Sequence, residues 1–213
     1  MNEAPPQSTR ASGHLFVVSA PSGAGKTSLV RALVAARDGL RVSISHTTRA
    51  RRDGEVDGVD YHFIEPDRFA RMADAGEFLE HATVFDHSYG TSRAAVATLL
   101  DAGHDVMLEI DWQGARSIRA AAPDAISIFV LPPSLATLEA RLRGRGDAAA
   151  VIARRMRDAQ REISHYPEYD YLVVNDDFDQ ALAALAAILD ATAQRREVQS
   201  LRHAALLAEL VAR

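Results

Sequence analysis

The chain has 213 residues, with 24 basic and 29 acidic side chains, eight histidines and no cysteine. This length accommodates one large domain or one domain with inserted lobes, and a hydrophobic content of 47% excludes an intrinsically disordered chain. The absence of cysteine excludes a disulfide scaffold, a thiolate zinc site and cysteine catalysis, and the net charge of −5 disfavours a dedicated nucleic-acid-binding protein.

The N-terminal residues and the apolar segments predict a cytoplasmic protein. Residues 1–12 are rich in proline, serine and other polar residues, so we expect a flexible tail there. This stretch contains an acid and two prolines but no apolar h-region, unlike a secretory signal. No uncharged apolar run reaches the ~18 residues of a membrane span, and no membrane partner is expected.

The first motif of the chain follows a predicted strand. Residues 14–20, H-L-F-V-V-S-A, form a short apolar run rich in β-branched and aromatic residues, which is typical of a buried strand. The segment A-P-S-G-A-G-K-T comes next, and L-V-R-A-L-V-A-A-R (29–37) then has apolar residues at helical spacing. A strand, a glycine-rich turn and a helix in this order open an α/β unit.

Residues 20–27 match the P-loop pattern G-x-x-x-x-G-K-[ST], except that Ala20 takes the place of the first glycine. In such a loop, backbone N–H groups turn inward around phosphate oxygens, and the next helix points its positive N-terminus at the same anion. Lys26, the only lysine beside 23 arginines, is placed to reach the β- and γ-phosphates, and the Thr27 hydroxyl to ligate Mg²⁺. An ordinary strand-to-helix turn is the less favoured alternative. The predicted ATP-binding residues here are Ala20, Pro21, Ser22, Gly23, Ala24, Gly25, Lys26, Thr27 and Ser28.

The middle of the chain interrupts the α/β pattern. Residues 40–97 contain short alternating segments, such as Y-H-F-I (61–64) and F-L-E-H-A (78–82), separated by glycine and aspartate turns. This pattern predicts an inserted lobe of small strands, with a helix near 66–75.

A cluster of arginines lies in the first part of this insertion. Arg49, Arg51 and Arg52 are close together, and no acid occurs between Leu40 and Arg52. Guanidinium groups bind phosphate oxygens in a bidentate fashion, and Tyr61 can add a hydroxyl donor. A solvated basic loop explains the cluster equally well.

The α/β pattern resumes after the insertion and continues to the C-terminus. Strands are predicted at 104–110, 125–131 and 171–175, and helices near 112–121, within 134–163 and from about 178 to the end. The first of these strands leads into Asp111. An acid at the carboxyl end of a parallel strand beside a P-loop can complete the Mg²⁺ shell, although such an acid is also a common helix N-cap.

Several motifs together resemble the guanylate kinase family. They are the P-loop opening, S-H-T-T-R-x-x-R-x-G-E-x-x-G-x-D-Y-x-F, F-L-E-H-A, Y-G-T, L-E-I-D-W-Q-G, R-L-x-x-R-G and V-N-D-D, and they cover residues 14 to about 190 in the family's order. The resemblance implies transfer of the γ-phosphate of ATP to GMP with Mg²⁺. It also implies an α/β fold: a P-loop NTPase core of three α/β/α layers with a parallel sheet, an inserted GMP-binding lobe and a helical lid.

Three other functions agree less well with these motifs. A kinase for another nucleotide is disfavoured by the residues that the resemblance places around guanine. A non-catalytic interaction module of guanylate kinase-like fold usually has a damaged P-loop, whereas Lys26, Thr27 and Arg49 are present here. A GTPase switch would need an N-K-x-D motif, which the sequence lacks.

The resemblance also implies the residues that bind GMP. It places the GMP phosphate on Arg49, Arg52, Tyr61 and Tyr89, and the guanine base on Ser45, Glu80, Thr91 and Asp111. Guanine presents two adjacent donors, N1–H and the N2 amino group, and one carboxylate such as Glu80 can accept both. Asp111 can face both the base and the metal, and the sequence does not divide these roles.

The predicted lid carries a second group of arginines. By resemblance Arg141, Arg145 and Arg155 close over the ATP phosphates, and Asn175 lies beside the adenine. Lys26, Arg49, Arg145 and Arg155 are accordingly the expected catalytic residues. The family commonly has R-G-T where this chain has R-G-D, so Asp147 adds a negative charge near the lid turn.

These predictions divide the chain into a guanylate kinase-like domain at 13–192 and a helical extension at 193–213. Within the domain we expect a core at 13–44, 98–135 and 165–192, a GMP-binding lobe at 45–97 and a lid at 136–164. The apolar spacing of the extension could support a homo-oligomer. The expected partners are ATP, GMP and Mg²⁺, with no nucleic acid.

Overall fold

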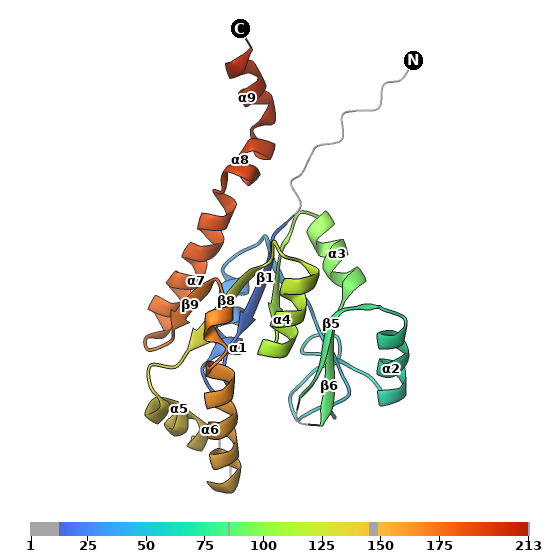
Figure 1. Ribbon diagram of the computed structural model, residues 1–213, viewed down its shortest axis with the longest axis vertical. Helices are drawn as coiled ribbons and strands as arrows, with labels where there is room; N and C mark the ends of the chain where they lie inside the picture. The colour runs from blue at the N-terminus through green and yellow to red at the C-terminus, as the bar shows by residue number, and fades with distance from the viewer. Residues whose placement is uncertain (1–12, 85, 145–148, 213) are drawn as a thin grey trace.

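A five-stranded parallel sheet forms the centre of the molecule (Figure 1). The computed structural model describes residues 13–84, 86–144 and 149–212. The strand order is β2-β7-β1-β8-β9, and every neighbouring pair is parallel. The strands are β1 (Leu15–Ser19), β2 (Leu40–Val42), β7 (Asp105–Glu109), β8 (Ile126–Leu131) and β9 (Tyr171–Val174). The prediction of an α/β fold with a parallel sheet is confirmed.

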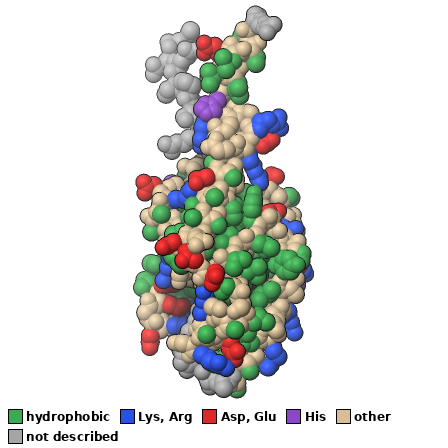
Figure 2. All heavy atoms as spheres, turned by 90° about the vertical axis from the view of Figure 1, so that its left-hand side faces the viewer, with side chains coloured by type: hydrophobic (Ala, Val, Ile, Leu, Met, Phe, Trp, Pro, Cys, Tyr) green, Lys and Arg blue, Asp and Glu red, His purple; other side chains and the backbone are tan. Residues whose placement is uncertain are grey.

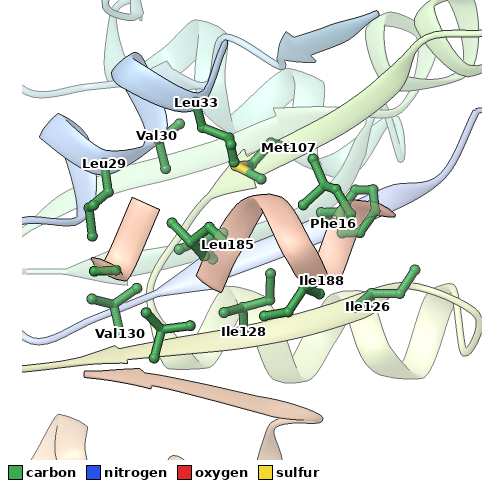
Figure 3. Packing of buried hydrophobic residues seen from close by; sticks show 14 of the residues in the cluster. Phe16, Leu29, Val30, Leu33, Met107, Ile126, Ile128, Val130, Leu185 and Ile188 are labelled. Carbon is green, nitrogen blue, oxygen red and sulfur yellow. The ribbon is translucent and has the colours of Figure 1, made fainter. Parts of the chain in front are cut away.

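Helices cover both faces of this sheet, because alternate side chains of each strand point to opposite sides. Phe16 and Val18 of β1 pack with α1 (Lys26–Ala35) and α7 (Phe178–Ala193). Leu15 and Val17 pack on the other side with α3 (Arg93–Asp101) and α4 (Trp112–Ala121). Figure 3 shows the first of these clusters, in which Leu185 and Ile188 of α7 lie against strand side chains.

A second, smaller sheet lies beside the core and corresponds to the predicted insertion (Figure 1). Its order is β4-β3-β6-β5, with β3 (His46–Thr47), β4 (His62–Phe63), β5 (Phe78–Val84) and β6 (His87–Ser92). The helix α2 (Pro66–Asp74) packs against it through Phe69, whose ring stacks on Phe78 at a centroid distance of 4.6 Å. The sheet also contacts the core, because β5 packs against α4.

The predicted helical segment at 134–163 consists of two helices, α5 (Leu135–Arg143) and α6 (Ala149–Ile163). They pack on each other through Leu138, Leu142, Ile152 and Ala159. A short 3₁₀ turn, η1 (Tyr166–Glu168), then leads back to β9. Arg145 and Asp147, two residues singled out in the lid, lie outside the described residues.

The C-terminal segment differs from the expected single helix. The helix α7 ends at Ala193 and is followed by α8 (Arg196–Arg202) and α9 (Ala204–Val211). Arg195 has extended backbone angles, and the Gln199 side-chain amide donates to the Ala193 carbonyl at 2.7 Å, so the last turn of α7 is capped. In Figure 1, α8 and α9 project beyond the core. No helix within the described ranges is long and apolar enough to cross a membrane.

This arrangement predicts a large difference between two leucines. We expect Leu185→Ala to lower the free energy of unfolding by about 2–5 kcal/mol, because Leu185 is fully buried between α7 and the sheet. Leu201→Ala in α8 should change it by less than ~0.5 kcal/mol, because that side chain is 63% exposed. Urea unfolding of both variants in dilute solution measures the difference, and equal losses would contradict the described core.

Candidate active site

A cleft of about 350 Å³ opens where β1 and β7 end, between the main sheet and the smaller sheet. The carboxyl ends of parallel strands are the usual place for ligands in open α/β sheets. Its lining contains the predicted residues Ala20, Pro21, Ser22, Gly23, Gly25, Lys26, Thr27, Ser28, Ser45, Tyr61, Glu80, Tyr89 and Asp111. The structure therefore brings these members of the predicted ATP and GMP sets to one cavity, whereas its lining does not include Ala24, Arg49, Arg52, Thr91, Arg141 or Asn175.

The P-loop is built by the turn between β1 and α1. Gly23 and Gly25 have positive φ angles of 95° and 94°, which side chains rarely adopt. A Cβ atom on Gly25 would also clash with the Nδ2 atom of Asn175. Asn175 is only 5% exposed, and this Nδ2 atom donates to the Ala24 carbonyl at 2.7 Å.

Arg141 supports the same loop from α5. Its guanidinium donates to the Asn175 carbonyl at 3.0 Å and to the Ala24 carbonyl at 3.5 Å. Arg141 and Asn175 thus contact the loop backbone, and neither belongs to the cleft lining described above. Their predicted contacts with ATP stay predictions.

Lys26 and Thr27 both face an acid at the end of β7. The Thr27 hydroxyl donates a hydrogen bond to Glu109, and the Lys26 ammonium lies 3.8 Å from the same carboxylate oxygen. Glu109 also lines the cleft but was not among the predicted site residues. The L-E-I-D motif could have indicated Glu109, because residues 109 and 111 point to the same side of an extended chain.

Asp111 lies two residues further on and is the N-cap of α4. Its Oδ1 atom accepts a hydrogen bond from the Gly114 N–H at 2.9 Å, so the N-cap alternative describes its observed contact. Asp111 still lines the cleft, and its roles toward metal and base stay predictions.

The carboxyl group of Glu80 is buried at the wall of the cleft. Glu80 of β5 is 5% exposed, and its cross-strand neighbour Thr91 donates to its Oε1 atom at 2.6 Å. Burial raises the pKa of Glu80 to about 7, and the nearby charge of Asp111 adds to this rise, while the Thr91 hydrogen bond opposes it. A Cβ atom on Gly114 would lie 2.7 Å from Glu80 Oε2, so only glycine allows this approach of α4.

The arginine cluster is arranged by an acid that the sequence analysis did not select. Glu55 accepts two hydrogen bonds from the Arg49 guanidinium, at 2.6 and 3.0 Å, and one from the Arg52 N–H at 2.8 Å. The hydrogen bond from Arg49, reinforced by its charge, lowers the pKa of Glu55. Glu55 was visible only as part of the R-x-G-E motif.

Aromatic side chains connect this cluster with the cleft. The Arg49 guanidinium lies 5.5 Å from the ring centre of Tyr61, and that ring is 6.0 Å from the ring of Tyr89. Burial raises the pKa of Tyr61 above its ordinary value, so its hydroxyl stays protonated and can donate. Arg49, Tyr61 and Tyr89 are therefore brought together, with the two tyrosines in the cleft lining and Arg49 behind Tyr61. Arg52 has an exposed side chain outside the lining.

The last missed residue comes from α6, a helix of the predicted lid. Glu162, near the end of α6, lines the cleft and accepts a hydrogen bond from the Ser22 N–H at 3.2 Å. Arg155, the predicted lid residue within the described ranges, is half-buried on the same helix. No local pattern in the sequence pointed to Glu162.

Comparisons with known proteins agree with this geometry. The family model described as Guanylate kinase matches residues 12–192. A guanylate kinase of Chromohalobacter salexigens is 58% identical over 202 residues, which cover 94% of each chain. A guanylate kinase of Alkalilimnicola ehrlichii is 59% identical over 188 residues, covering 88% of this chain and 93% of that one. The crystal structure of guanylate kinase from Anaplasma phagocytophilum superimposes with a TM-score of 0.74 at 34% identity, covering 88% and 89% of the two chains.

These matches extend over nearly the whole chain, including the P-loop, the small sheet and the lid helices. They confirm the resemblance, the P-loop NTPase fold and the expectation of a nucleotide kinase, and they do not favour the non-catalytic module. The chain belongs to the guanylate kinase family.

Proposed function

We propose that the protein transfers the γ-phosphate of ATP to GMP, giving ADP and GDP. The observation that carries this proposal is the shared cleft, which has a P-loop on one side and the buried carboxyl group of Glu80 on the other. A phosphate donor and a guanine base can thus bind within one cavity. The names of the relatives described above support the same reaction.

The P-loop side of the cleft suits the phosphates of ATP. The loop and the first turn of α1 present backbone N–H groups, and Lys26 adds a positive charge. Arg141 and Asn175 hold the loop backbone in place. Arg155, together with Arg145, is proposed to neutralise charge on the transferred phosphoryl group, since positioning and charge stabilisation supply most of the catalysis in phosphoryl transfer.

The residues beside the P-loop fit a magnesium ion. The Thr27 hydroxyl and the Glu109 carboxylate are hard oxygen donors that already contact each other. Among the described residues no group of three or more acids or histidines is arranged to hold a metal, which agrees with an ion that takes most of its ligands from phosphate and water. We propose Thr27 and Glu109 as its holders, with Asp111 as a further candidate. When bound, the ion neutralises charge on the β- and γ-phosphate oxygens.

Glu80 is proposed to select the base. In its ionised form the carboxylate accepts from both N1–H and the N2 amino group of guanine, while Thr91 fixes its orientation. Adenine has an acceptor at N1 and would leave this buried carboxylate unpaired. Ser45 and Asp111, which line the same cavity, are proposed to bind the remaining polar edge of the base.

The phosphate of GMP is assigned to Arg49, Arg52, Tyr61 and Tyr89. Glu55 orients the Arg49 guanidinium through two hydrogen bonds, and Tyr61 beside it lines the cleft together with Tyr89. The pairing with Glu55 also lowers the net positive charge of the arginine cluster. The Arg49 guanidinium is therefore already oriented for a dianionic phosphate, and the cluster carries no large excess of positive charge.

We also propose the domain roles, the cellular location and the metabolic role that the sequence suggested. Residues 45–97 act as the GMP-binding lobe and 136–164 as the lid of a domain at 13–192. The protein functions in the cytoplasm in purine nucleotide metabolism and GMP recycling. No nucleic-acid partner is proposed, in keeping with the net charge of −5.

The projecting extension is proposed to pair with a second copy of the chain. Every residue of α9 is exposed although seven of its eight residues are apolar, and Figure 2 shows hydrophobic side chains on this segment. A helix that is apolar on all sides normally packs against a partner. Arg202, the last residue of α8, and Glu209, near the end of α9, place opposite charges toward the two ends of this segment.

This order of charges is complementary to itself. In an antiparallel pair of copies, the end that carries Arg202 lies next to the end of the other copy that carries Glu209. The order of charges thus favours a second copy over an unrelated partner.

Base selection by Glu80 predicts a specific defect. We expect Glu80→Gln to raise the KM for GMP on the order of a hundredfold, because the amide places a donor against one of the two guanine donors. The affinity for ATP should stay within about twofold of wild type, since the P-loop is unchanged. Coupled ADP release and calorimetry with ATP measure these quantities, with the exposed Glu77→Gln as the matched control.

The same assay with GMP, AMP, UMP and CMP, with and without Mg²⁺, tests the proposed reaction itself. Turnover should require Mg²⁺ and be confined to GMP. AMP turnover equal to that with GMP, or equal loss of GMP and ATP binding in Glu80→Gln, would contradict the assignment.

The proposed pairing predicts a charge dependence. Glu209→Arg should weaken self-association on the order of tenfold in sedimentation velocity, because it replaces two ion pairs by two repulsions. The double variant Arg202→Glu with Glu209→Arg should restore it. A wild-type chain that stays monomeric at all concentrations, or a double variant as weak as the single one, would refute the antiparallel pairing.

A further inference from the structure

The lid helix α6 has an inward face that carries two charged residues. Ile152, Arg155, Ala159 and Glu162 recur at intervals of three and four residues, and each is buried or half-buried, whereas Gln160 on the outer side is exposed. Apolar residues normally occupy such a face. Arg155 and Glu162 are seven residues apart, so they lie on the same side of the helix at a separation of ~10 Å along its axis.

Glu162 connects this face with the P-loop. Its Oε2 atom accepts the hydrogen bond from the Ser22 N–H at 3.2 Å, which joins residues 140 positions apart in the sequence. Burial raises the pKa of Glu162 to about 7, and the neighbouring Asp111 and Asp158 add to the rise, while the Ser22 hydrogen bond and Lys26 oppose it. The proposed ATP contacts described above do not use this carboxyl group.

The chain immediately after α6 is held at a second point. The His165 ring stacks on Trp112 at the start of α4, with a centroid distance of 3.7 Å and an interplanar angle of 9°. Glu168 pairs with both His165 at 2.8 Å and Arg116 of α4 at 2.5 Å. In Figure 1, α5 and α6 extend from the core and the chain returns to it through this turn.

Two anchors fix a helix better than one. The contact around Trp112 attaches the end of α6 to the core, but a single attachment leaves the helix able to swing about it. The hydrogen bond between Glu162 and Ser22 lies between that anchor and Arg155. It therefore sets the direction in which the rest of α6, including Arg155, leaves the core.

We propose that Glu162 is a positioning residue that fastens the core-proximal end of α6 to the P-loop and thereby orients Arg155 toward the phosphates of ATP. This inference rests on the proposed binding of ATP at the P-loop, but it does not depend on which nucleotide accepts the phosphate. It assigns to Glu162 no contact with substrate. Loss of the hydrogen bond between Glu162 and Ser22 displaces the distant Arg155 guanidinium, while the P-loop sequence stays intact.

Three variants test this role. Glu162→Ala should raise the KM for ATP on the order of tenfold and lower kcat several-fold, because small misplacements of a charged group are costly in phosphoryl transfer. The KM for GMP should stay within about twofold, since the GMP residues lie on other elements. Glu162→Gln should remain close to wild type, because its amide oxygen can accept the same Ser22 N–H. Gln160→Ala, on the exposed side of the same turn, is the matched control.

The outcomes distinguish a positioning role of Glu162 from a contribution to overall stability and from a direct role of its charge. Equal rises in both KM values together with a lower Tm would show a merely structural role and overturn the proposal. A Gln variant as impaired as the Ala variant would show that the charge itself matters, and unchanged kinetics in the Ala variant would also refute it.

Calorimetric titration with ATP gives a readout that needs no turnover. It should show weaker binding for Glu162→Ala than for Glu162→Gln even if GMP is not the acceptor. A wild-type protein that binds ATP without phosphorylating GMP would refute the proposed function alone. Equal ATP affinities of the Ala and Gln variants would refute the positioning role alone.

Discussion

The buried carboxyl group of Glu80 is the interaction on which the junction of the two sheets depends. β5 presents it, Thr91 donates to it from β6, and Gly114 lets the first turn of α4 approach it. That turn begins at Asp111, next to the end of β7 and the P-loop. A carboxylate in such surroundings is costly unless donors satisfy it. We propose that a base with two adjacent N–H donors satisfies this carboxylate, so that its burial at the junction of the sheets also selects the ligand.

The P-loop depends on contacts from three segments that are remote in sequence. Asn175 follows β9, Arg141 belongs to α5 and Glu162 to α6, and each hydrogen bonds to the loop or to its immediate support. Two of these residues are on α5 and α6, the helices of the predicted lid, so hydrogen bonds connect these helices with the loop and its support. The charges of the chain are also unevenly distributed. Residues 40–52 and the lid are rich in arginine within a chain of net charge −5, and the excess acid lies elsewhere.

Local patterns predicted β1, β7, β8, β9 and the P-loop, because apolar runs and glycine spacing are properties of consecutive residues, whereas the short strands β2 and β3 and the polar strand β6 were not predicted. The contacts of Glu109 and Glu162 were not predictable in this way. Glu109 meets Thr27 only because β7 pairs with β1, and Glu162 meets Ser22 only because α6 returns to the core. The end of α7 was missed for a related reason. Helix-forming residues continue past Ala193, but Thr192 is the last residue of α7 that the core buries, and the extended backbone of Arg195 interrupts the helix.

The most direct test of this account is the number of protons released when GMP binds near pH 7. Burial raises the pKa of Glu80 to about 7, so its carboxyl group is partly protonated there, whereas the proposed guanine binding requires the carboxylate. Calorimetry in buffers of different ionisation enthalpy should therefore detect proton release on GMP binding that is larger for the wild type than for Glu80→Gln, and the GMP affinity of the wild type should fall more steeply as the pH drops below 7. Equal proton release in both proteins, or proton uptake by the wild type, would contradict the role of Glu80.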